Sequence, residues 1–211
     1  MKTDELISLM VEDAPAREAP RRALALAILA GALVSGALFF TILGVRPDFH
    51  IAAETVRFVF KFILTLALAT TAILLALRIG RPGLPLTARA IGLLLAPMLL
   101  VGAVVAELMA VPASDWHRRL VGTNAMHCLT IIPLLSLAPL AFMLVALRQG
   151  APDNPGLAGA VAGLVSSGMA ATFYASNCTD DSPLFVATWY TIAIGVVVAL
   201  GYVVGKRLLR W

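Results

Sequence analysis

Long apolar stretches recur along the chain, and short polar segments separate them. A helix of about 20 residues crosses the hydrocarbon core of a bilayer. Only helices and closed barrels satisfy every backbone polar group in lipid, and the alternating polarity of barrel strands is absent. The pattern therefore predicts an all-α fold, an integral membrane bundle of six transmembrane helices. The predicted spans are Ala23–Gly44, Val56–Leu77, Ala90–Leu108, Ala125–Leu147, Gly156–Ser176 and Leu184–Gly205.

The composition supports a membrane protein and bounds its organisation. Of the 211 residues, 60% are hydrophobic and 13% are charged, whereas a soluble domain is about 45–50% apolar and about a quarter charged. We expect two parts: a tail over residues 1–22 that carries a short helix, and a transmembrane domain over residues 23–211. The chain has no P-loop, no Gly-rich nucleotide fingerprint, no HExxH and no GxSxG. An enzyme is therefore not expected.

Basic residues are distributed unevenly between the two ends of the predicted spans. With a cytoplasmic N-terminus, 11 of the 16 Lys and Arg residues lie on the cytoplasmic side and 5 on the outer side. This asymmetry predicts a multi-pass protein of the bacterial inner membrane with both termini in the cytoplasm. The net charge of +4 then reflects Lys and Arg retained on the cytoplasmic side. Membrane lipid is an expected partner, and no direct nucleic-acid partner is expected.

The predicted orientation places both cysteines and all three histidines on the outer side. These residues are His50, His117, His127, Cys128 and Cys178. Thiolates and imidazoles are the ligands that soft and borderline metal ions prefer. A metal site here would use Cys128, Cys178, His127, Asp180 and Asp181, and it would hold a transient heavy-metal ion. No resident cofactor is expected.

Three interpretations of the cysteine pair remain open at this point. Cys128 and Cys178 form a structural disulfide, as thiols in the oxidising periplasm often do. Alternatively they are a sensing pair that changes its oxidation or metal-bound state. In the third interpretation they are unrelated, and Cys128 is a small buried hydrophobic residue.

Charged residues within the predicted spans form a second feature. Arg57 and Lys61 are one helical turn apart and share a face, and Glu107 lies at a similar depth on the third span. Because buried charges in membranes tend to pair, we expect an intramembrane pair between Lys61 and Glu107. Arg57 is expected to extend towards the outer headgroups.

Small residues and prolines predict how the spans pack. Gly159, Gly163 and Ser167 are spaced four apart, as are Gly201 and Gly205, and this spacing lets helices approach closely within the bundle. Prolines inside spans three and four, such as Pro139, free backbone carbonyls that neighbouring helices must satisfy. The oligomeric state stays open.

The tail contains a short amphipathic segment. Thr3, Asp4 and Glu5 are typical of a helix start, and Pro15 ends the helix. Leu6, Leu9 and Met10 form an apolar stripe that needs a cover, either a partner groove or the inner leaflet. The acidic excess of the tail favours a basic protein over anionic lipid. The predicted partner-binding residues are Asp4, Glu5, Leu6, Ile7, Leu9 and Met10.

The chain resembles the NrsF-type membrane anti-sigma factors, negative regulators of an extracytoplasmic-function sigma factor. The resemblance covers the whole chain. It rests on the opening Met1-Lys2-Thr3-Asp4-Glu5-Leu6-Ile7-Ser8-Leu9, the six spans, Gly44-Val45-Arg46-Pro47-Asp48, and the positions of Cys128 and Cys178.

The resemblance implies a function for the tail and for the cysteines. The tail would sequester an extracytoplasmic-function sigma factor, and Cys128 and Cys178 would be needed to perceive heavy-metal or oxidative stress. The alternative is a small six-span metal-handling transporter with outer Cys and His ligands. In a transporter the tail would be dispensable and metal flux would be measurable.

Overall fold

The computed structural model describes residues 19–79, 87–150 and 152–210, and every regular element in these ranges is helical. Six helices are long and apolar enough to cross a membrane, which confirms the predicted fold class. The spanning helices are α2 (Ala19–Ile42), α4 (Val56–Ile79), α6 (Leu95–Ala110), α8 (Ala125–Leu147), α9 (Pro155–Ala175) and α11 (Thr191–Leu208). Shorter elements are α3 (Phe49–Ala53), α5 (Thr87–Gly92), α7 (Ala113–Val121), α10 (Pro183–Phe185) and the π-helix η1 (Val186–Tyr190).

The boundaries agree with the hydropathy pattern to within a few residues, and α8 has the predicted bounds. Helix α2 begins at Ala19, so the last four residues of the predicted tail are already helical. The short helix predicted near the start of the tail lies outside the described residues. The last span runs through α10 and η1 into α11 without interruption.

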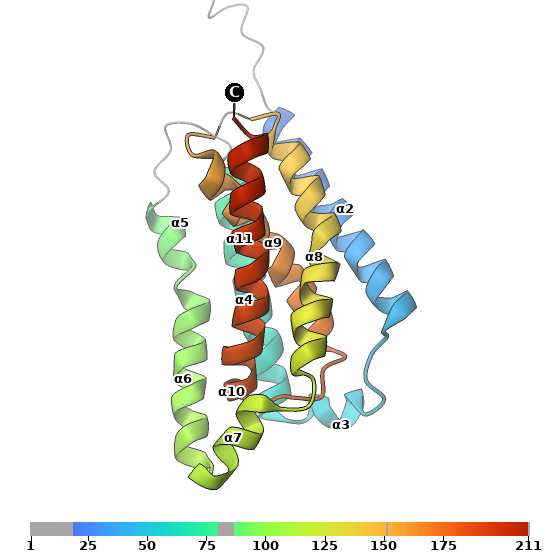
Figure 1. Cartoon of the computed structure of the whole chain (residues 1–211), viewed down its shortest axis with the longest axis vertical. Coiled ribbons are helices and arrows are strands. Elements are labelled where there is room, and N and C mark those ends of the chain that lie inside the picture. The colour runs from blue at the N-terminus through green and yellow to red at the C-terminus, as the bar shows by residue number, and fades with distance from the viewer. Residues whose placement is uncertain (1–18, 80–86, 151, 211) are drawn as a thin grey trace, which may run out of the picture.

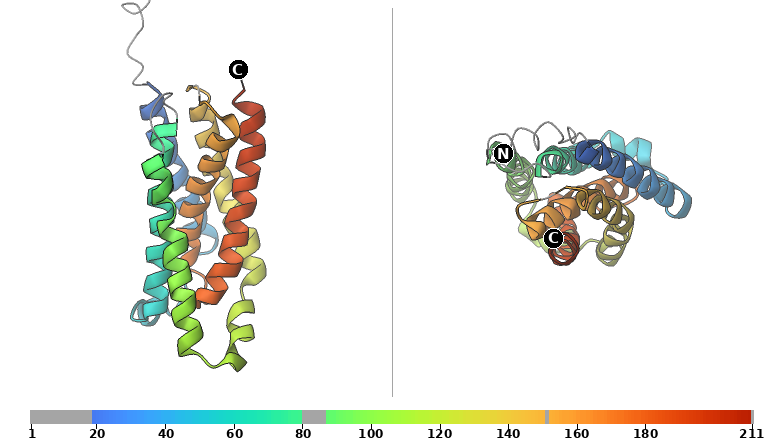
Figure 2. Two further views of the ribbon diagram at one scale, coloured as in Figure 1. Left: turned by 90° about the vertical axis from the view of Figure 1, so that its left-hand side faces the viewer. Right: turned by 90° about the horizontal axis from the view of Figure 1, so that it is seen from above.

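The spans form an elongated bundle with two distinct ends (Figures 1 and 2). Helix α2 starts and α11 finishes at the same end, here called the terminal end. The opposite end, here called the loop end, carries α3, α7 and α10. A first span that starts and a last span that finishes at the same end are what an even number of spans requires.

Helix α9 is the central helix and packs most extensively against α11 and α4. Its small residues allow this, since a Cβ on Gly159 would lie 2.8 Å from the Cα of Gly205 and closer still to the carbonyl of Gly201. A Cβ on Gly163 would lie 2.8 Å from the carbonyl oxygen of Val197. The predicted small-residue spacing therefore serves packing within the bundle.

Helices α2 and α8 approach closely at a proline. A Cβ on Gly31 would lie 2.8 Å from the Cα of Pro139. Pro139 has no N–H for the carbonyl four residues earlier, and Leu135 O instead accepts a hydrogen bond from Ser35 Oγ at 3.1 Å. At this proline the predicted satisfaction by a neighbouring helix is confirmed.

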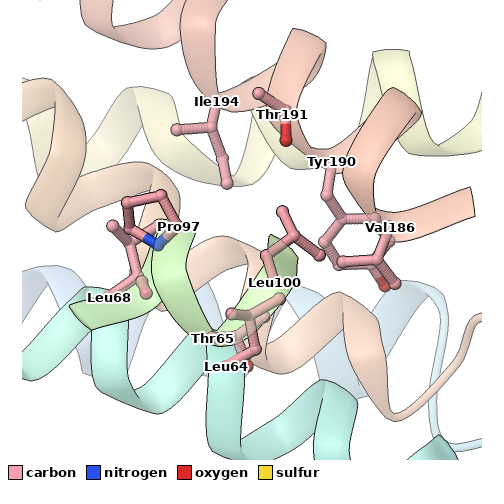
Figure 3. A pocket seen from close by; sticks show the side chains of 10 residues that line it. Leu64, Thr65, Leu68, Pro97, Leu100, Val186, Tyr190, Thr191 and Ile194 are labelled. Atoms are coloured by element: carbon pink, nitrogen blue, oxygen red, sulfur yellow. The ribbon is translucent and has the colours of Figure 1, made fainter. Parts of the chain in front are cut away.

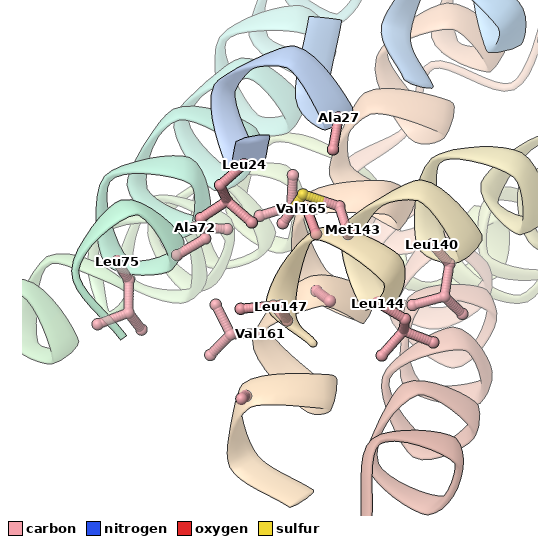
Figure 4. Packing of buried hydrophobic residues seen from close by; sticks show 14 of the residues in the cluster. Leu24, Ala27, Ala72, Leu75, Leu140, Met143, Leu144, Leu147, Val161 and Val165 are labelled. Atoms are coloured by element: carbon pink, nitrogen blue, oxygen red, sulfur yellow. The ribbon is translucent and has the colours of Figure 1, made fainter. Parts of the chain in front are cut away.

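Towards the terminal end, a core cluster joins four helices (Figure 4). Leu24 from α2, Ala72 from α4, Met143 from α8 and Val165 from α9 are all buried there. Large apolar side chains also cover the outside of the bundle, as on α2 and α6, where lipid is the natural solvent.

Helix α6 is the least buried span. An apolar cavity of about 160 Å³ lies between it, α4 and the η1–α11 segment (Figure 3). Leu68, Leu100 and Ile194 line this cavity, and the ring of Tyr190 forms part of its wall. Tyr190 also belongs to a second buried cluster near the loop end, and this cluster contains both cysteines.

Candidate functional site

The segment 176–182, here called the Cys178 loop, joins α9 to α10 at the loop end. It is hydrogen-bonded to the chain that directly follows α2. The N–H of Arg46 donates to the carbonyl oxygen of Ser176 at 3.1 Å. Asn177 Nδ2 donates to the carbonyl oxygen of Gly44 at 3.1 Å. The Cys178 loop and the end of α2 are therefore one structural unit.

Two buried cations hold the Cys178 loop. Lys61 Nζ lies 2.5 Å from Asp181 Oδ1 and donates to the carbonyl oxygen of Cys178 at 2.8 Å. The second carboxylate oxygen of Asp181 accepts from Arg46 Nη1 at 2.8 Å. Both cations also lie over the ring of Phe58, with Arg46 Cζ 5.6 Å and Lys61 Nζ 5.4 Å from its centroid. A buried charge is costly unless it is paired, and here Asp181 is shared by two cations.

Arg46 also forms a forked ion pair with Asp48, through two hydrogen bonds of 2.7 Å each. Such bidentate geometry is strong and directional. The guanidinium holds the pKa of Asp48 below its usual value. The Asp48 hydrogen bond in turn raises the pKa of Arg46 above its ordinary value, against the effect of burial. The Arg46 side chain is therefore charged and fixed in place.

The predicted pair between Lys61 and Glu107 is wrong. Glu107 instead accepts hydrogen bonds from Arg57 Nε at 2.9 Å and from Arg119 Nη1 at 3.1 Å. The physical reason is the Cys178 loop, which folds onto α4 and presents Asp181 to Lys61. Arg57 lies one turn closer to the loop end, where α6 places Glu107. Arg57 is therefore in an ion pair and does not extend freely to headgroups.

The two cysteines lie in one buried cluster and both are free thiols. Cys128 is in the first turn of α8, and Cys178 follows the end of α9; neither side chain is exposed. The Cys178 Sγ donates to the carbonyl oxygen of Asp180 at 3.7 Å. Burial raises the pKa of the Cys178 thiol, although Lys61 opposes that effect. The resting site therefore holds the neutral thiol at Cys178 near neutral pH.

Asp180 connects the Cys178 loop to the start of α8. Its Oδ2 accepts hydrogen bonds from the N–H of Thr123 at 2.9 Å and of Asn124 at 2.8 Å. Asn124 is the residue that precedes α8, and its carbonyl oxygen accepts from the N–H of Cys128 at 2.8 Å. A carboxylate at a helix N-terminus is favourable. Asp180 thus fixes the turn of α8 that carries Cys128.

The predicted five-ligand metal site is not assembled. In residues 19–79, 87–150 and 152–210, no group of three or more His, Cys, Asp or Glu side chains is arranged to hold a metal ion. His127 is exposed on the surface of α8. The carboxylates of Asp180 and Asp181 are engaged in the hydrogen bonds described above. Of the predicted ligands, the structure buries the two thiols together in one cluster.

The tail residues predicted to bind a partner, Asp4, Glu5, Leu6, Ile7, Leu9 and Met10, lie outside the described residues. Sequence reasoning also missed three residues of the site. Arg46 was assigned only to a segment of family resemblance, yet it holds the Cys178 loop. Tyr174 and Tyr190 lie beside the thiols, and no motif in the sequence indicates that position.

Comparison with known proteins decides the family. The sequence profile described as "Negative regulator of sigma F" matches residues 10–211. The chain belongs to this family. It is 32% identical over 216 aligned positions to the "Probable anti-sigma-F factor NrsF" of Azospira oryzae, with both chains covered completely. It is 34% identical over 217 positions to the "Anti-sigma-F factor NrsF" of Caulobacter vibrioides, again with complete coverage. No solved structure matches the chain.

Family membership settles the class of function. Anti-sigma factors are regulators rather than enzymes, and their partner is a sigma factor. The membership therefore favours a membrane anti-sigma factor over the transporter alternative. The recognition of the family from the residues is confirmed along the chain.

Proposed function

We propose that this anti-sigma factor resides in the bacterial inner membrane with both termini in the cytoplasm. It sequesters an extracytoplasmic-function sigma factor through the tail, residues 1–22. It releases that sigma factor when a heavy-metal ion or an oxidant reacts with Cys128 and Cys178 on the periplasmic side. The loop end is then periplasmic and the terminal end cytoplasmic.

One observation carries this proposal: the Cys178 loop is hydrogen-bonded to the segment that follows α2, through Arg46 and Asn177. Helix α2 begins at Ala19, within the last residues of the tail, and runs along the bundle to the loop end (Figure 1). A displacement of the Cys178 loop therefore acts on the helix that bears the tail. The signal and the response would then be connected through helix α2.

The loop also contacts the other spans at the same end. Asp181 holds Lys61 on α4, and Asp180 holds the start of α8 near Cys128. Any chemistry that draws the Cys178 sulfur towards a new partner has to strain these bonds. The change would then spread to three spans, α2, α4 and α8.

Access to the loop is available from the loop end. An open cavity of about 520 Å³ is lined there by Thr179, Asp180 and Asp181 of the Cys178 loop, together with arginines of α4 and α7. A periplasmic solute can therefore reach the outer surface of the loop. The thiols themselves lie beneath this surface, so reaction requires the loop to open. That requirement couples the chemistry to a conformational change.

The energetics limit what the signal can do. A ligand shifts a two-state equilibrium only by its differential affinity for the two states. A shift from almost full sequestration to almost full release requires about a 10⁴-fold preference for the releasing state. Two sulfur–metal bonds, formed in the releasing state and absent from the resting state, are a source of such a preference.

The test of the tail is a substitution in the expected apolar stripe. Leu6→Asp places a charge where the sigma factor should bury an anchor, and loss of such an anchor typically costs about 1–3 kcal/mol, or roughly ten- to hundredfold in affinity. We expect the sigma factor to be released and its target genes to be transcribed without stress. The measurement is a transcriptional reporter together with pull-down of the sigma factor by the full-length chain.

The matched control is Ser8→Asp, which introduces the same charge on the opposite face of the expected helix. It should leave sequestration nearly unchanged. If Leu6→Asp still silences the sigma factor, the tail is not the binding segment as proposed. If both variants release it equally, the charge of the tail rather than the apolar stripe decides binding.

A further inference from the structure

Two buried hydroxyl groups near the thiols have no nitrogen or oxygen hydrogen-bond partner among the described residues. Tyr174 and Tyr190 are at most 1% exposed, and both hydroxyls lie within hydrogen-bonding reach of the Cys178 thiol. Their ring centroids are 5.9 Å apart with an interplanar angle of 41°. Buried tyrosine hydroxyls normally find a partner, because an unsatisfied donor loses the hydrogen bond that it had in water. Two such groups side by side therefore require an explanation.

The surroundings of these hydroxyls are the two cysteines. Tyr174, Tyr190, Cys128 and Cys178 belong to the same buried cluster, and both phenol hydroxyls are in reach of a hydrogen bond to the Cys178 thiol. Lys61, already paired with Asp181, adds a positive charge near both sulfurs. The site thus combines two thiols, two hydroxyl donors beside the Cys178 sulfur and a nearby cation, all withdrawn from water.

This combination fits a sulfur anion better than a neutral thiol. A neutral thiol is a weak hydrogen-bond acceptor, so in the resting state both phenol groups have only a weak partner at Cys178. A thiolate is a strong acceptor, and hydrogen bonds to an ionised group are shorter and stronger than neutral ones. The arrangement is therefore poised for a state in which the sulfurs have lost their protons. Cation binding is one reaction that produces such a state.

We propose that Tyr174 and Tyr190 complete a binding site for a soft divalent cation, with Cys128 and Cys178 as the ligands and the two hydroxyls as hydrogen-bond donors to the bound sulfurs. Two S–H bonds break, two sulfur–cation bonds form, and two protons pass to water, so the net charge of the site does not change. The tyrosines stay protonated throughout. Thiolates are the ligands that soft cations select.

This inference extends the proposed sensing role to two further residues, which act through the ligands rather than on the cation. Groups that hydrogen-bond to metal ligands orient them and typically change metal affinity by about 10- to 100-fold. The hydroxyls also favour the bound state, because binding replaces the weak neutral thiol acceptor by a thiolate, which is a stronger acceptor. The tyrosines would therefore set the concentration at which the sensor responds.

The test is a titration of the purified full-length chain in detergent with Cd²⁺ alone, without any sigma factor. Binding is followed through the ultraviolet charge-transfer absorption of cadmium–thiolate bonds, with a chelator as competitor. We expect the Tyr174→Phe, Tyr190→Phe double variant to bind Cd²⁺ roughly 10- to 100-fold more weakly than the unsubstituted chain. Each single variant should give an intermediate loss. Phe keeps the ring, so the packing of the cluster is retained.

Tyr202→Phe is the matched control, because Tyr202 is the third tyrosine of the chain and is 41% exposed on α11. Its affinity for Cd²⁺ should equal that of the unsubstituted chain. The Cys128→Ser, Cys178→Ser double variant should show no charge-transfer band.

Two results would overturn the inference. One is an unsubstituted chain that binds no Cd²⁺. The other is a double Phe variant whose affinity for Cd²⁺ is within twofold of that of the unsubstituted chain. This second result includes the case in which only thermal stability changes, because the hydroxyls hold a structural water. Because no sigma factor is present, failure here leaves sequestration by the tail untouched. If the tail fails to bind its partner, that result likewise does not contradict the proposed cation site.

Discussion

Lys61 Nζ donates a hydrogen bond of 2.8 Å to the carbonyl oxygen of Cys178, so a cation on α4 holds the backbone of a cysteine 117 residues later in the chain. The same ammonium contacts Asp181. Lys61 is fully buried, and the free-energy cost of burying its charge is offset only while both partners are in place. The position of the Cys178 sulfur therefore depends on an ion pair that it does not itself join.

Replacement of Lys61 should destabilise the chain. Lys61→Met keeps the length of the side chain but leaves Asp181 with Arg46 alone and the Cys178 carbonyl without its donor. Breaking a buried pair typically costs about 3–5 kcal/mol, and the remaining pair with Arg46 reduces this to about 2 kcal/mol. Thermal unfolding of the purified chain measures the effect.

The control for this variant is Lys206→Met, since Lys206 is exposed near the end of α11. It should change stability by less than about 0.5 kcal/mol. Equal effects of the two substitutions would show that the ion pair between Lys61 and Asp181 does not stabilise the fold.

The sequence was sufficient for the architecture because the bilayer imposes it. Spans such as Ala125–Leu147 are apolar throughout, and no other fold satisfies their backbone groups in lipid. The close approach of α9 and α11 could also be predicted. Glycines spaced four apart, such as Gly159 and Gly201 with their neighbours, are typical of membrane helices whose backbones approach closely.

The site could be predicted only in part. The hydropathy pattern placed both cysteines at one end of the bundle. Whether the two thiols lie in one cluster depends on how the seven-residue Cys178 loop folds back. Lys61 and Glu107 lie at a similar depth in the membrane. Depth alone does not reveal that Lys61 pairs with Asp181 instead. Tyr174 and Tyr190 could not be predicted to face the thiols, because tyrosine in a span is equally typical of the membrane interface.

The link between Asp180 and the start of α8 should control exposure of the thiols. Asp180→Ala removes the acceptor of two backbone N–H groups, at Thr123 and Asn124. We expect a loss of about 1–3 kcal/mol in stability and faster labelling of Cys128 and Cys178 by a water-soluble maleimide. Asp115→Ala is the control, because the Asp115 side chain forms an ion pair with exposed Arg118 on α7, away from the start of α8. No difference in labelling between these variants would contradict the role given to Asp180.

Reactivity of Cys178 should depend on pH in a direction fixed by its burial. Burial raises the pKa of this thiol, so the folded state favours the protonated form. The resulting contribution to stability is present below the ordinary thiol pKa, about 8.5, and is lost as the pH rises above it. In a Cys128→Ser chain, alkylation by iodoacetamide should be slow at about pH 8 and should accelerate only at higher pH than in the denatured chain. Coincident pH profiles for the folded and denatured chains would refute this.

The contact between α9 and α11 should not tolerate a larger residue. Gly159→Ala places a methyl group against the backbone of Gly201 and Gly205, and overpacking of this kind typically costs about 1–3 kcal/mol. Gly195→Ala is the matched control on α11, because a Cβ there meets nothing within 4 Å. The measurement is thermal unfolding in the same detergent. A Gly159→Ala chain as stable as the Gly195→Ala chain would show that the two helices separate readily.

The central claim is that chemistry at the two cysteines releases a sigma factor held at the opposite end of the bundle. The most direct measurement uses membrane vesicles that contain the full-length chain with its sigma factor bound, and follows co-sedimentation of the sigma factor as Cd²⁺ is added to the face that carries the loop end. The account predicts that the affinity for the sigma factor falls roughly tenfold or more, where tenfold corresponds to about 1.4 kcal/mol, and that it does not fall with the Cys128→Ser, Cys178→Ser chain. Retention of the sigma factor by the unsubstituted chain at saturating Cd²⁺ and after oxidant treatment, or equal release from both chains, would contradict the account.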